Sequence, residues 1–194
     1  MSDLRTKRTR ASIRSAFLTL RAKKPLEKIT VKELAELAQI NKATFYLHYR
    51  DIYDLSDQIE NEILAESLNK LKPSDPVLDD PSDFVRKLID ACEPQRQELD
   101  IVFSNGREAV LPDKLEAGVK AHYYEENPQM AGNLYVDILL SFMIQGAYRA
   151  YVKHLDKGKV EVLSMVADIA HNLARLYQSH PSARELKETD RPGD

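Results

Sequence analysis

The stretch of sequence that decides the fold is residues 31–50, VKELAELAQINKATFYLHYR. Its apolar residues recur at helical spacing in two short groups, which residues 39–41 separate. Thr30 begins a capping-box pattern before the first group, and Asn41 is a suitable cap for the second. The pattern therefore predicts a short helix, a tight turn, and a second short helix over residues 42–49.

The same stretch meets the physical requirements of a helix-turn-helix. Two helices that cross steeply need a small residue where they approach most closely, and Ala35 stands there. The second helix has to expose its first turn to base edges, and Lys42, Ala43 and Thr44 are small or polar. The apolar residues expected to face inward are Leu34, Ala38, Ile40 and Phe45.

Helical spacing continues on both sides of this stretch. An apolar stripe that begins at Ile13 predicts a first helix ending before Pro25, and Asp51 is placed to cap a long helix running to about Leu71. Six glycines and the lack of alternating apolar and polar residues leave little room for strands. We predict an all-α fold of about nine helices. The later helices are expected at residues 81–92, 95–104, 112–126, 129–155 and 159–179.

Charge is unevenly distributed along the chain. Residues 1–50 have a formal net charge of +8, and residues 51–194 have one of −11. This asymmetry indicates a polyanion-binding module joined to a body with a different role. Two interpretations remain open for Arg5, Lys7, Arg8 and Arg10: a disordered tail without a defined site, or a flexible arm that adds phosphate attraction.

Composition excludes several classes of protein. The chain has 194 residues, and its apolar runs are too short to span a bilayer. The first residues lack the apolar segment of a signal peptide, and the single cysteine, Cys92, excludes an intramolecular disulfide. The expected compartment is the cytoplasm. We find no phosphate loop, no nucleophile elbow and no metal-binding pattern, so we expect neither an enzyme nor a cofactor nor a metal site.

Residues 30–55, TVKELAELAQINKATFYLHYRDIYDL, resemble the signature of TetR-type (TetR/AcrR) transcriptional regulators, most specifically in the F-Y-x-H-Y block. The resemblance extends over roughly residues 8–65. It implies a helix-turn-helix DNA-binding domain over residues 1–52 and a helical regulatory and dimerisation domain over residues 53–179. A flexible tail is expected over residues 180–194. The positions expected to contact DNA are Thr30, Lys42, Ala43, Thr44, Tyr46, His48 and Arg50.

Two positions depart from the family pattern. Gln39 stands where the turn usually has glycine, so we expect it to adopt a left-handed conformation at a cost of about 1 kcal/mol. Ile52 replaces a basic residue that is common near the start of the fourth helix, and Arg50 is placed to supply the missing phosphate contact.

The last two predicted helices are more apolar than one buried stripe requires. Residues 134–154 and 159–178 therefore predict a homodimer built as a four-helix bundle, which suits a palindromic operator. The alternative is a monomeric body with a thick core.

The resemblance further implies a repressor that a small-molecule effector releases from DNA. The alternative is a regulator without an effector, or one controlled by a protein partner. The candidate effector-binding residues, each of which also suits a plain core position, are Phe84, Leu88, Cys92, Phe103, Tyr123, Tyr124, Phe142, Gln145 and Arg149.

Overall fold

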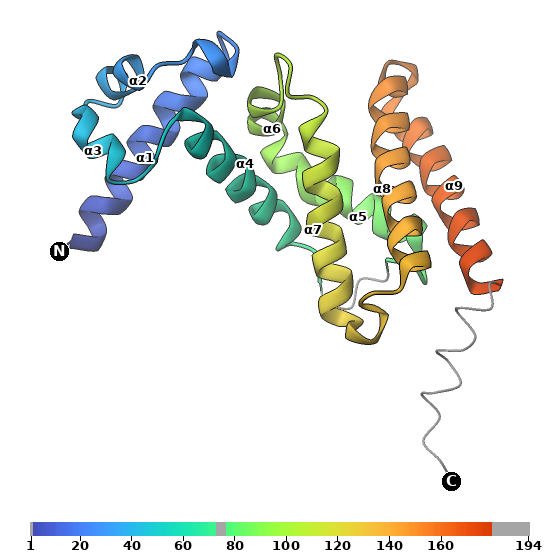
Figure 1. Ribbon diagram of the computed structural model, residues 1–194. Helices are drawn as coiled ribbons and strands as arrows, with labels where there is room; N and C mark the ends of the chain where they lie inside the picture. Colours follow the sequence, from blue (N-terminus) through green and yellow to red (C-terminus); the bar gives the residue numbers. More distant parts are fainter. Residues whose placement is uncertain (1, 73–76, 180–194) are drawn as a thin grey trace. The chain divides into compact units, whose positions relative to one another are not determined.

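The structure, a computed structural model, describes residues 2–72 and 77–179. Within these residues every regular element is a helix and no strand is present, which confirms the all-α prediction (Figure 1). The α-helices are α1 (Ser2–Arg21), α2 (Val31–Leu37), α3 (Lys42–Tyr46), α4 (Ile52–Leu68), α5 (Pro81–Cys92), α6 (Arg96–Val102), α7 (Val110–Glu126), α8 (Leu134–His154) and α9 (Lys159–Ser179). Short 3-10 turns lie at Leu26–Lys28, Glu93–Gln95, Pro128–Met130 and Leu155–Lys157.

The chain divides into two compact units. The first contains α1 to α4 as far as Glu66, together with α6, and the second contains α5, most of α7, α8 and α9. The predicted boundary at residues 52 and 53 does not coincide with this division. The reason is that α4 buries its apolar stripe in the first unit and α6 packs against α1.

The first unit is built around α1 and α4. The predicted α1 stripe is buried, and the helix ends before Pro25. Asp51 caps α4 as predicted, because its Oδ1 accepts a hydrogen bond of 2.8 Å from the Asp54 backbone N–H. The helix α1 begins at Ser2, so the basic residues near the N-terminus are helical. The structure thus has a helix where the sequence predicts a disordered tail or a flexible arm, and the attraction of this segment to phosphate stays a prediction.

Local signals fix most helix bounds in the second unit. Pro81 stands at the first position of α5, and Asp80 Oδ1 accepts from the Asp83 N–H at 3.1 Å. The predicted start of the long helix at residue 129 is wrong. A 3-10 turn occupies Pro128–Met130, and Asn133 caps α8 by accepting from the Val136 N–H at 3.2 Å.

Two other helix bounds differ slightly from the prediction, and one predicted segment lies outside the described residues. The helix predicted over residues 95–104 is α6, which ends at Val102, and α7 begins two residues before the predicted residue 112. The predicted tail over residues 180–194 lies outside the described residues. No helix among the residues described is long and apolar enough to cross a membrane.

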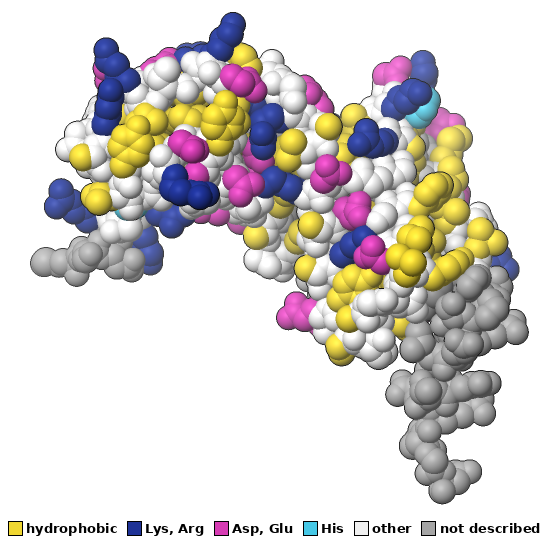
Figure 2. Space-filling model, viewed as in Figure 1, with side chains coloured by type: hydrophobic (Ala, Val, Ile, Leu, Met, Phe, Trp, Pro, Cys, Tyr) yellow, Lys and Arg dark blue, Asp and Glu magenta, His cyan; other side chains and the backbone are white. Residues whose placement is uncertain are grey.

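The helices α8 and α9 pack against each other, and α9 also packs against α5. Tyr151, Val162 and Val166 form the buried cluster between them. Both helices also leave large apolar side chains exposed on their outer surfaces (Figure 2). These exposed residues are Leu134, Ile138, Phe142 and Val152 on α8, and Val160, Met165, Ile169 and Leu176 on α9.

Candidate nucleic-acid interface

The turn between α2 and α3 is set by backbone hydrogen bonds at the end of α2. The Ile40 N–H donates to the Ala35 carbonyl at 3.0 Å, and the Gln39 N–H donates to the Glu36 carbonyl at 3.2 Å. This pair of bonds is the Schellman pattern, which requires a left-handed residue between Ala38 and Ile40. Gln39 has a φ of 55°, so the predicted strained conformation is confirmed.

Side-chain caps begin both short helices. Thr30 Oγ1 accepts from the Glu33 N–H at 3.2 Å, as the capping box predicts. The return bond of the box is not formed among the described residues, because the Glu33 carboxylate pairs with the Lys24 ammonium. Asn41 Oδ1 accepts from the Thr44 N–H at 2.7 Å and from the Thr44 hydroxyl at 2.9 Å.

The helix α3 is shorter than predicted, ending at Tyr46 rather than residue 49. The next residues form turns in which the N–H groups of His48 and Tyr49 both donate to the Phe45 carbonyl. Tyr49 is buried as predicted, and its ring lies 5.7 Å from the fully buried Phe45 ring. Tyr49 thus lies on the same inward side as Phe45 although α3 has already ended.

The predicted DNA-contacting residues lie on and around α3. Lys42 and Ala43 are exposed in its first turn, and Tyr46 is exposed over 57% of its surface. Thr44 and His48 are half-buried, and the Thr44 hydroxyl already donates to Asn41. Thr30 and Arg50 are exposed at the starts of α2 and α4. The surface thus offers a cation, a phenol hydroxyl and small side chains on a rigid support.

Arg50 is placed by the start of α4. Its backbone N–H donates to Asp54 Oδ2 at 2.8 Å, and this bond is the main cause that lowers the pKa of Asp54. Its guanidinium is 3.4 Å from Asp54 Oδ1 but remains largely exposed. Ile52 is buried and Arg50 is an exposed cation at this end of the helix, and the contact of Arg50 with phosphate stays a prediction.

Sequence reasoning did not identify Leu47 as part of this surface. Its side chain is 82% exposed and follows Tyr46 in the chain, so an apolar group stands beside the exposed residues of α3. The spacing of Phe45 and Tyr49 is the sequence signal for this position, because both residues face inward and Leu47 between them then faces outward.

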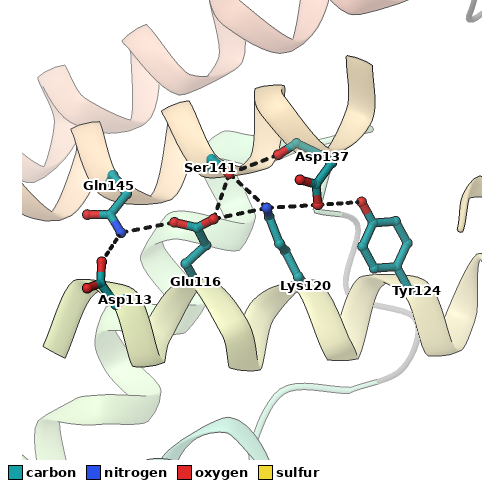
Figure 3. Close-up of polar contacts among 7 residues, drawn as sticks. All are labelled: Asp113, Glu116, Lys120, Tyr124, Asp137, Ser141 and Gln145. Atoms are coloured by element: carbon teal, nitrogen blue, oxygen red, sulfur yellow. Dashed lines mark hydrogen bonds and ion pairs between the residues drawn. The ribbon is translucent and has the colours of Figure 1, made fainter. Parts of the chain in front are cut away.

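A second polar cluster joins α7 to α8 in the other unit (Figure 3). Lys120 is 2.9 Å from Glu116 and 2.8 Å from Asp137, and it donates to Ser141 at 2.7 Å. Gln145 donates its amide N–H groups to Asp113 and Glu116, at 2.7 and 2.9 Å. The seven residues of this α7–α8 ladder are Asp113, Glu116, Lys120, Tyr124, Asp137, Ser141 and Gln145.

The α7–α8 ladder stabilises the ionised form of Glu116. Burial alone raises the pKa of Glu116, but hydrogen bonds from Ser141 and Gln145 and the Lys120 ammonium outweigh it and lower the pKa to about 2. The pKa of Lys120 is raised, because Asp137 and Glu116 outweigh its desolvation. The spacing of four α7 residues at i, i+3, i+7 and i+11 was the sequence signal for this cluster.

The predicted effector-binding residues differ in burial and in the unit to which they belong. Phe103 belongs to the first unit and Phe142 is 65% exposed on α8, so neither lines an interior of the second unit. The Gln145 amide is engaged in the ladder, and Arg149 is exposed. Tyr124 donates to Asp137 at 3.2 Å. Phe84 and Tyr123 are buried, and Leu88 and Cys92 are half-buried.

Cysteine and metal chemistry add no further candidate. Burial raises the pKa of the Cys92 thiol, which disfavours the reactive thiolate. Residues 2–72 and 77–179 contain no group of three or more His, Cys, Asp or Glu side chains arranged to hold a metal ion. Comparisons with protein-family models, with curated proteins and with solved structures found no match for this chain.

Proposed function

We propose that this protein is a sequence-specific DNA-binding transcriptional regulator that acts as a homodimer and reads the major groove with α3. The observation that carries the proposal is the outward presentation of Lys42, Ala43 and Tyr46 from a helix whose opposite side is fixed by fully buried Phe45. A short, rigid helix with an exposed first turn is what a helix-turn-helix inserts between base edges.

Phosphate contacts are available around this reading surface. Arg50 and Thr30 are exposed at the starts of the helices that flank α3, and His48 is the second residue after α3. Donors of this kind fix the register of a protein on the duplex without reading sequence. The net charge of +8 over residues 1–50 supplies the sequence-independent attraction.

The homodimer is proposed from the apolar residues that α8 and α9 leave exposed. Leu134, Ile138 and Phe142 follow one another at i, i+4 and i+8, so they share one side of α8. Met165 and Ile169 form a matching row on α9. Contiguous apolar surface of this kind marks an interaction site, and a second copy of the same helix pair covers it with its own rows.

Release by a small-molecule effector stays a prediction from the resemblance, because several of the residues predicted to bind it are buried or half-buried in the second unit while Phe142 and Arg149 are exposed. No described feature favours control by a protein partner, and none favours repression over activation.

The proposal is tested by selecting duplexes from a randomised library with the purified full-length protein. We expect recovery of an inverted repeat, because a symmetric dimer presents two α3 helices to two half-sites. Recovery of single half-sites would contradict the dimer, and a library that stays unenriched after repeated rounds would contradict sequence-specific binding.

A further inference from the structure

The first turns of α1 are positively charged, and their side chains contribute nothing to the buried core. Arg5 and Arg8 are exposed, and among residues 4–11 no side chain is buried. The only large apolar residue of this segment, Leu4, is exposed as well, and the buried stripe of α1 starts at Ile13. The segment therefore contributes little to the folded core, and its surface is basic.

The positive charge at the N-terminal end of α1 is unfavourable for an isolated helix. The N-terminal end of a helix has a partial positive charge, so a cationic side chain at the end of its first turn, such as Arg5 in α1, is unfavourable. Arg5 and Arg8 stand at i and i+3 and so lie on neighbouring positions of one side. An external polyanion beside this end would remove the unfavourable interaction and favour the helical form.

Arg10 connects this segment to α4 and to Tyr49, which follows α3 in the chain. Its Nη2 donates to Glu62 Oε1 at 2.9 Å and lies 3.4 Å from Gln58 Oε1, both on α4. Its guanidinium is also 5.8 Å from the centre of the Tyr49 ring, which follows α3 in the chain. At a rise of about 1.5 Å per residue, Arg8 and Arg5 lie about 3 and 7.5 Å farther along the axis. In Figure 1 these turns of α1 extend beyond α3 toward the N-terminus.

We propose that residues 5–10 of α1 form a rigid basic arm that binds DNA phosphates beside the half-site read by α3. Arg5 and Arg8 contact phosphate, and Arg10 is a positioning residue that holds the arm through Glu62 and Tyr49. This inference rests on the proposed function and adds a contact surface to it. The arm increases affinity for any duplex and reads no sequence, because it offers only cations to the backbone.

The test measures the binding of fluorescent duplex by full-length protein between 50 and 200 mM salt. The duplex is the inverted repeat selected by the wild-type protein. In Arg5→Gln/Arg8→Gln, each lost phosphate contact lowers the slope of log affinity against log salt by about 0.9, so the slope falls by about 3.6 for a dimer. Glutamine keeps a good helix former at both sites. The control, Lys153→Gln/Lys157→Gln, removes the same charge from exposed positions of the other unit and leaves the slope unchanged.

A second variant tests whether the arm has to be rigid. Thr6→Gly/Thr9→Gly keeps every charge and weakens the helix. A rigid arm predicts weaker binding at each salt concentration, and binding equal to the wild type would show that the segment acts as a flexible tail. If the wild-type protein selects and binds duplex but Arg5→Gln/Arg8→Gln matches the control variant, the arm is wrong and the proposed function stands. If the wild-type protein binds no duplex, the proposed function itself fails.

Discussion

Arg107 and Glu60 form a two-pronged ion pair in the first unit, 47 residues apart in the chain. Arg107 Nε is 2.9 Å from Glu60 Oε1, and Arg107 Nη2 is 2.9 Å from Glu60 Oε2. Glu60 is fully buried, and the Ser56 hydroxyl also donates to its carboxylate at 2.7 Å. The segment after α6 is thereby fastened to the middle of α4.

Arg107→Met should therefore destabilise the protein strongly. Removing one partner leaves an uncompensated buried charge, and such changes cost about 3–5 kcal/mol. The double variant Glu60→Met/Arg107→Met should recover most of the loss, because no charge remains buried. Urea unfolding of the single and double variants checks this. Equal stabilities for Arg107→Met and the double variant would show that the unpaired Glu60 carboxylate costs nothing in the folded protein.

Gln39→Gly should raise the free energy of unfolding. Gln39 has a φ of 55°, and a left-handed conformation costs a residue with a side chain about 1–2 kcal/mol, part of which glycine loses again through its greater freedom in the unfolded chain. We expect a net gain of about 0.5–1 kcal/mol. Gln39→Ala is the control, since alanine keeps the strain. A gain of equal size in both variants would show that relief of strain is not the cause.

Lys42→Ala and Tyr46→Phe should weaken binding to the selected duplex without changing the unfolding transition, because both side chains are exposed. Loss of a base contact costs about 1–3 kcal/mol, and loss of a phosphate contact lowers the salt slope by about 0.9. Fluorescence anisotropy at fixed salt measures both effects. Lys153→Ala, at an exposed position of the other unit, is the matched control for Lys42→Ala. Unchanged affinity in both test variants would show that α3 does not contact the duplex.

Phe142→Glu and Ile169→Glu should each convert the dimer into monomers. Each places a charge in the centre of an apolar contact between copies, where it would have no partner. Sedimentation velocity at micromolar concentration measures the species present. Ser164→Glu adds the same charge at an exposed position outside the α9 row and should remain dimeric. Dimers that persist in both Phe142→Glu and Ile169→Glu would place the contact elsewhere.

The α7–α8 ladder should give an acid-dependent contribution to stability. The pKa of Glu116 in the folded protein is about 2, below its ordinary 4.5, so the folded state favours the ionised carboxylate. Its contribution is fully present above about pH 4.5 and is lost as the pH falls toward 2. The difference in unfolding free energy between wild type and Glu116→Gln should therefore shrink over this range. A difference that stays constant down to pH 2 would contradict the shifted pKa.

Short-range signals predicted the elements near α3 well. Thr30, Asn41 and Asp51 each cap a helix from their own side chain, and the strain at Gln39 follows from its place after α2. These features depend on residues a few positions apart, which the sequence displays directly. The helical start of α1 was missed because residues 2–11 contain no apolar periodicity.

Contacts between distant segments could not be predicted in the same way. Apolar spacing shows that Phe142 lies on a helix, but not that its side faces outward from the unit. The Glu60–Arg107 pair and the α7–α8 ladder join elements whose packing partners no local pattern names.

The salt dependence of duplex binding by the wild-type protein tests the central claim most directly. A dimer that touches about 6–10 phosphates should lose about 10³- to 10⁵-fold in affinity between 50 and 200 mM salt, and the selected inverted repeat should bind more tightly than a scrambled duplex throughout. Absence of binding at 50 mM salt, or equal affinity for the selected and scrambled duplexes, would contradict a sequence-specific DNA-binding regulator.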